Sequence, residues 1–126
     1  MKTKTFVKKY QGRGVEDWIS YMSDDAKQFA KDFKSTVKDI FKDDGIDIVN
    51  WSVGHYFMSG FLKKDDKYVY FSRNIERRGY PIHLEGHDVL FGILVRTAKS
   101  DKDYTGGHNN FTSMTDLRQT VLRLFE

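Results

Sequence analysis

Two stretches of alternating side chains, separated by a short charged segment, constrain the fold of this chain most. Odd-numbered residues from Trp51 to Phe61 fall on one side of an extended chain, and Val69 and Phe71 alternate with Tyr70 in the same way. Side chains of a β-strand point to opposite faces with a period of two, so both stretches predict strands with one covered face. The charged residues 63–67 between them predict a hairpin loop. Most of the remaining chain is expected to extend or cover this hairpin.

Helices are predicted on both sides of the hairpin. Ser23 has the character of an N-cap, and apolar residues recur at helical spacing from there to about residue 42. A closing helix is predicted after Ser113, with its apolar stripe in residues 117–125. The nearly continuous apolar run at 89–95 predicts a strand buried on both faces. The expected fold is α+β: an N-terminal helix, an antiparallel β-sheet of three to five strands, and a C-terminal helix packed on one face.

Length and composition predict a single domain. The chain has 126 residues, of which 39% are hydrophobic and 15% aromatic, and this is enough for one core. Cysteine is absent, which excludes disulfides, thiolate metal sites and cysteine nucleophiles. No apolar run approaches the roughly 18 residues of a membrane span, and the first residues lack a signal-peptide core. We therefore expect a soluble, cytoplasmic protein.

Two sets of cations are candidates for contact with phosphates. The first thirteen residues hold five cations and no acid, so residues 1–14 form either a basic arm along a phosphate backbone or an edge strand protected by lysines. Further lysines share one side of the predicted helix, although six aspartates on the same segment also fit a solvated face. A net charge of +3 permits polyanion binding without requiring it. The candidate nucleic-acid contacts are Lys2, Lys4, Lys8, Lys9, Arg13, Lys27, Lys31, Lys34 and Lys38.

A long irregular segment and a polar loop supply the candidate partner contacts. Residues 73–88 carry three arginines, and loops of that length in a compact domain are commonly functional. Residues 100–110 contain paired glycines, which favour either a structural turn or a close approach to a ligand such as a nucleotide. The predicted anchors are Arg73, Arg77, Arg78, Arg96 and Lys99, with Tyr104, His108 and Asn109 as a polar rim.

Histidine spacing does not predict an enzyme or a metal centre. His83 and His87 invite comparison with a zinc helix, but glutamate does not directly follow the first histidine, and Gly86 disfavours a helix there. Nothing in the spacing of the four histidines singles out an acid–base pair. We therefore expect no catalytic residue, no metal and no cofactor.

Two segments resemble small uncharacterised proteins carried by phages and conjugative elements of Gram-positive bacteria. They are GHYFMSGFLKKDDKYVYFS at 54–72 and ILVRTAKSDKDYTGGHNNFTSM at 93–114. Such proteins include inhibitors of CRISPR nucleases and other anti-defence proteins. The resemblance implies a non-enzymatic inhibitor in the bacterial cytoplasm, which binds a host defence protein such as a CRISPR nuclease or its nucleic-acid complex. The alternatives are an accessory protein of a mobile element that binds nucleic acid directly, and a protein that binds or sequesters a nucleotide at residues 105–110.

Overall fold

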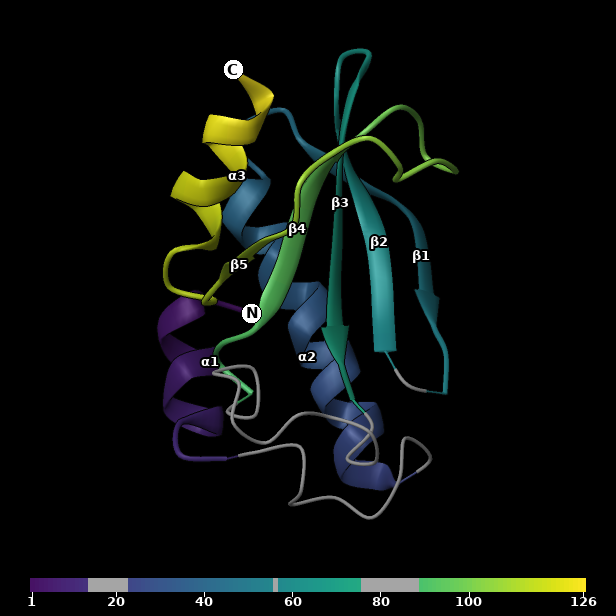
Figure 1. The fold of residues 1–126 in the computed structure, drawn as a ribbon. Helices are drawn as coiled ribbons and strands as arrows, with labels where there is room; N and C mark the ends of the chain where they lie inside the picture. Colours follow the sequence, from purple (N-terminus) through teal and green to yellow (C-terminus); the bar gives the residue numbers. More distant parts are fainter. Residues whose placement is uncertain (14–22, 56, 76–88) are drawn as a thin grey trace.

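A computed structural model describes residues 1–13, 23–55, 57–75 and 89–126 (Figure 1). Within these ranges the chain forms three helices and five strands, which confirms the α+β class predicted from the sequence. None of the helices in these ranges is long and apolar enough to cross a membrane. The elements are α1 (Thr3–Tyr10), α2 (Asp24–Phe41), β1 (Asp47–Val53), β2 (Phe57–Lys64), β3 (Lys67–Asn74), β4 (Ile93–Ala98), β5 (Asn110–Thr112) and α3 (Leu117–Phe125).

The five strands form one antiparallel sheet in the order β1-β2-β3-β4-β5. Across its middle, Phe61 pairs with Tyr70, and Tyr70 pairs with Arg96. The helices lie on one side of the sheet (Figure 1), where α2 contacts β1 and α3 contacts β3 and β4. No helix of the described residues covers the other face.

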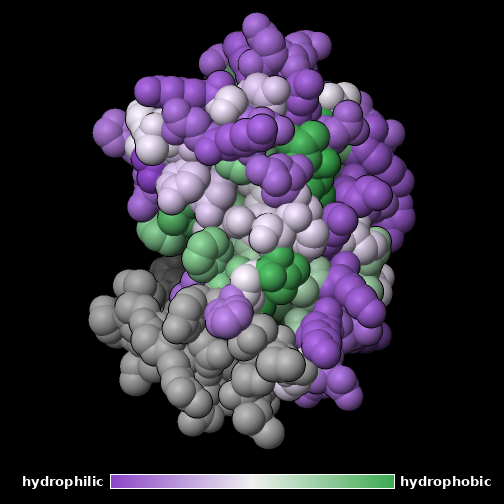
Figure 2. Space-filling model, turned by 90° about the vertical axis from the view of Figure 1, so that its right-hand side faces the viewer, coloured by the Kyte–Doolittle hydropathy of each residue, from purple (hydrophilic) through white to green (hydrophobic). Residues whose placement is uncertain are grey.

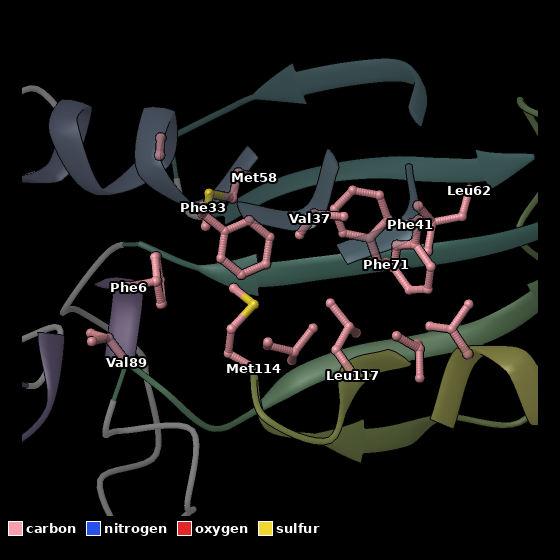
Figure 3. Close-up of a cluster of buried hydrophobic side chains, with 14 of the residues drawn as sticks. Phe6, Phe33, Val37, Phe41, Met58, Leu62, Phe71, Val89, Met114 and Leu117 are labelled. Atoms are coloured by element: carbon pink, nitrogen blue, oxygen red, sulfur yellow. The ribbon is translucent and has the colours of Figure 1, made fainter. Parts of the chain in front are cut away.

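The core fills the space between the sheet and the helices (Figure 3). Alternate residues of each central strand are buried, among them Leu62, Val69 and Val95. From α2, Phe33 places its ring 6.2 Å from that of Phe71, measured between centroids. This packing fixes the sheet against α2, so the opposite sheet face is presented on a rigid support.

The main helix begins and ends where its local signals predict. The Ser23 hydroxyl accepts a hydrogen bond from the Ala26 amide (3.2 Å), and Asp24 and Asp25 occupy the positive end of the helix dipole. The helix ends at Phe41, and Gly45 then adopts a φ of 69°.

The first residues are helical, so the prediction of an edge strand at 1–14 is wrong. Phe6 and Tyr10 are four residues apart and share the buried face of α1, which packs on α2. Lys4 and Lys8 are exposed on the outer side of α1. The N-terminal segment is therefore part of the helical layer, not a free arm.

The stretch predicted as one strand from Trp51 to Phe61 is two strands. A turn separates β1 from β2, and the Gly54 amide donates to the Phe57 carbonyl across it (2.9 Å). The alternating pattern of the sequence continues across this turn, so the pattern did not indicate that β1 ends and β2 begins there. The strand expected at 89–95 begins only at Ile93, because Gly92 adopts a φ of 70°.

Candidate functional site

The uncovered face of the sheet, which we call the open face, carries aromatic and small polar side chains. Strand alternation and register place on it, among other residues, Ser52, Phe57, Ser59, Phe61, Tyr70, Ser72, Leu94, Arg96 and Phe111. Phe57 and Phe111 are 44% and 64% exposed, unusual values for phenylalanine. Figure 2 views the molecule from the β1 side and shows apolar and near-neutral side chains gathered between hydrophilic ones.

Part of the open face is hollowed into a groove of about 460 Å³, which we call the aromatic groove. It is lined by Asn50, Ser52, Phe57, Ser59, Phe61, Tyr70, Lys102 and Tyr104. The rings of Phe61 and Tyr70 meet edge to face with centroids 5.3 Å apart, and both side chains are largely buried. Tyr104 stacks on Tyr70 at 4.6 Å from the loop between β4 and β5.

That loop is held in place by Arg96. Its Nη2 donates to the Gly107 carbonyl, its Nη1 donates to Asn109 Oδ1 (3.0 Å), and its guanidinium lies 5.9 Å from the centroid of the Tyr104 ring. The guanidinium group therefore makes its hydrogen bonds to the protein's own loop. Arg96 is therefore a positioning residue for the loop and for Tyr104.

Two further contacts fix the tip of the loop. Asp103 Oδ1 accepts hydrogen bonds from the amide (3.0 Å) and the hydroxyl of Thr105, and these bonds lower the pKa of the carboxyl. Across the groove, Asn50 Nδ2 donates to the Asp101 carbonyl (2.7 Å) and ties the loop to β1. Lys102 and Tyr104 thus reach the groove from a pre-organised backbone.

Gly107 leaves no room for a side chain, and this yields a test of the loop. A Cβ at this position would lie 2.6 Å from the Thr97 carbonyl oxygen. We expect Gly107→Ala to displace the loop and lower the free energy of unfolding by about 1–3 kcal/mol, measured by urea denaturation. Gly54→Ala is the matched control, because its Cβ would meet only ordinary contact at 3.5 Å. Equal stability of the two variants would contradict the described packing of the loop on Thr97.

The predicted partner contacts separate into two groups. Arg96 contacts both Tyr104 and Asn109, as described above. Lys99 and His108 are exposed on the same loop.

The predicted arginine anchors behave differently. Arg73 is not in a loop: it belongs to β3, is only 1% exposed, and donates through Nη1 to the Asn74 carbonyl (2.9 Å). Its position on the core side of the strand corrects the prediction that it is a surface anchor. Arg77 and Arg78 lie outside the described residues, as do His83 and His87.

The candidate nucleic-acid contacts lie on the helical layer, away from the open face. Several of these cations are paired: Lys9 with Asp32 at 2.7 Å, Arg13 with Asp25 at 3.6 Å and Lys2 with Asp39 at 3.7 Å. Seven of the nine candidates are exposed, namely Lys2, Lys4, Lys8, Lys9, Lys27, Lys31 and Lys38. A second groove on α2 brings together Lys31, Lys34, Lys38 and Lys42.

Sequence reasoning missed most of the aromatic groove. Alternation placed Phe57 and Phe61 on one side of a strand, but no local signal tells which side the helices cover. No motif or spacing in the sequence identified Lys102 as a candidate binding residue. Residues 105–110, the alternative nucleotide site, do not line the aromatic groove.

Within the described ranges, no three histidine or carboxylate side chains are grouped so that they could hold a metal ion.

The chain matches no protein-family model, no curated protein and no solved structure.

Proposed function

We propose that this protein is a non-enzymatic inhibitor of a host defence system, which binds a CRISPR nuclease or its nucleic-acid complex through the open face. The observation that carries the binding role is the exposure of three aromatic side chains, Phe57, Tyr104 and Phe111, on the open face. Exposed apolar patches on soluble proteins mark interaction sites, and interfaces are enriched in aromatic residues and arginine.

The proposed target comes from the resemblance to proteins of mobile elements. Segment 54–72 contains β2 and residues 67–72 of β3. Segment 93–114 contains β4 and β5. The two segments therefore supply every residue of the aromatic groove except Asn50 and Ser52. This coincidence supports a function located on the open face.

Removal of the exposed rings is expected to abolish inhibition. We expect the double variant Phe57→Ala/Phe111→Ala to bind a purified CRISPR nuclease complex at least about 30-fold more weakly, because buried aromatic anchors dominate interface energies. Pull-down and cleavage assays across a panel of nucleases measure this. Lys31→Gln/Lys38→Gln is the matched control on the helical layer and should inhibit like the wild type. The proposal is wrong if no nuclease is bound, or if the ring variant inhibits fully.

A second candidate function is direct nucleic-acid binding through the helical layer. It is favoured by the convergence of Lys31, Lys34 and Lys38 with Lys42 in one groove. Binding of this kind falls steeply with salt because counterions are released from the phosphates. The variant Lys31→Gln/Lys38→Gln decides between the two functions. It weakens binding if the helical layer contacts nucleic acid, and it has no effect if the open face is the binding site.

A further inference from the structure

The aromatic groove presents two kinds of ring. Phe61 and Tyr70 form its floor and are 5% and 8% exposed. Phe57 and Tyr104 are 44% and 48% exposed, so about half of each side chain remains available to a ligand. An exposed ring on a fixed backbone is a platform for a nucleobase, because every base offers a π-face.

The remaining lining suits a polar, negatively charged ligand. Ser52 and Ser59 offer hydroxyls that can donate to or accept from base edges and sugars. Lys102 is exposed, and it is the one charged side chain among the described residues that line the groove. No carboxylate is among those lining residues, so the groove favours a phosphate over a basic peptide.

The shape of the groove favours a strand over a free mononucleotide. Small-molecule sites enclose most of their ligand, whereas this groove is open along the sheet. Phe57 and Phe61 stand four residues apart on β2 and so are separated by about 13 Å along the strand. That length accommodates adjacent nucleotides of an extended chain.

We propose that the aromatic groove binds unpaired nucleic acid, with Phe57 and Tyr104 stacking on bases and Lys102 contacting a phosphate. This inference rests on the proposed function and deepens it, because RNA-guided nuclease complexes expose an unpaired displaced strand. The open face then contacts the nucleic-acid part of the complex instead of its protein part.

The test measures binding of a labelled single-stranded oligonucleotide by fluorescence anisotropy. Tyr104→Leu retains apolar bulk but removes the ring, and we expect it to weaken binding about tenfold. Tyr104→Phe should retain binding. Lys102→Gln should lower the slope of log affinity against log salt by about 0.7, the value for one phosphate of a single strand. Arg123→Gln is the charge-matched control, because it removes one exposed cation on α3 outside both grooves, and it should leave the slope unchanged.

Each outcome separates this inference from the proposed function. Binding to the nuclease protein alone, without binding to the oligonucleotide, would overturn the inference and leave the proposed function standing. If the protein binds the oligonucleotide but binds no nuclease complex, the proposed function is overturned and this inference stands. Equal affinity for a duplex of the same sequence, or equal binding by Tyr104→Leu and Tyr104→Phe, would exclude base stacking. Thermal unfolding of each variant separates lost contacts from a lost fold.

Discussion

Replacement of Phe33 by alanine is expected to lower the free energy of unfolding by about 3–5 kcal/mol. The side chain is fully buried, and its ring centroid lies 6.4 Å from that of Trp51 and 6.2 Å from that of Phe71. It therefore joins α2 to two strands, and its removal leaves a cavity that the sheet cannot close. Domains of this size have about 5–15 kcal/mol of stability in total, so urea denaturation should show a large shift in midpoint.

Phe111→Ala is the matched control for Phe33→Ala. The same ring is removed, but from the open face, where it is 64% exposed. We expect a change within about 0.5 kcal/mol, as for other surface substitutions. Similar losses in the two variants would show that the open face is covered and would remove the basis for a binding site there.

The main helix could be predicted from the sequence because its signals are local. The hydroxyl of Ser23, the acids that follow it and the apolar stripe all lie within one segment, and the structure uses each of them. The same holds for α3, whose buried residues Leu117, Val121 and Phe125 follow the predicted stripe. Neither helix requires a distant partner to be recognised.

The first helix could not be predicted in the same way, because its segment also fits a strand. Thr3, Thr5 and Val7 alternate as in a strand, whereas Phe6 and Tyr10 have helical spacing. The choice depends on tertiary contacts: the Phe6 ring lies 5.8 Å from that of Phe29 on α2. Packing against a distant element outweighed a weak local preference.

The open face could be only half predicted. Alternation separates Phe57 and Phe61 from Met58 and Leu62, but both sets are apolar, so hydrophobicity alone does not decide which set the helices cover. Arg73 shows the same limit, since its charge indicated a surface position although strand register places it on the core side. The contact of Arg96 with Asn109 was not predicted either, because no pattern in residues 110–112 indicated the short strand β5 that pairs with β4.

Asp32→Ala is expected to lower the free energy of unfolding by about 2–4 kcal/mol. The carboxylate is buried between α1 and α2 and accepts hydrogen bonds from the Tyr10 hydroxyl (2.6 Å), Lys9 Nζ (2.7 Å) and Gln28 Nε2 (2.9 Å). Its removal leaves the buried Tyr10 hydroxyl without this acceptor. Asp43→Ala removes an exposed aspartate as a control and should change stability by less than about 0.5 kcal/mol.

The same carboxylate makes stability depend on pH in a direction that can be tested. Burial tends to raise the pKa of Asp32, but the hydrogen bonds from Lys9, Tyr10 and Gln28 outweigh it and hold the pKa below its ordinary value. The unfolded chain therefore takes up this proton at a higher pH than the folded chain does. The stabilisation is complete above the ordinary value of about 4 and is lost as the pH falls through the lower folded value.

Asp32→Asn isolates this dependence, because Asp39 and Asp103, whose pKa values are also lowered, remain in both proteins. We expect the stability difference between wild type and Asp32→Asn to be constant near neutral pH and to shrink as the pH falls below about 4. Urea denaturation at a series of pH values measures it. A difference that is unchanged in acid would mean that the carboxylate is not ionised between α1 and α2.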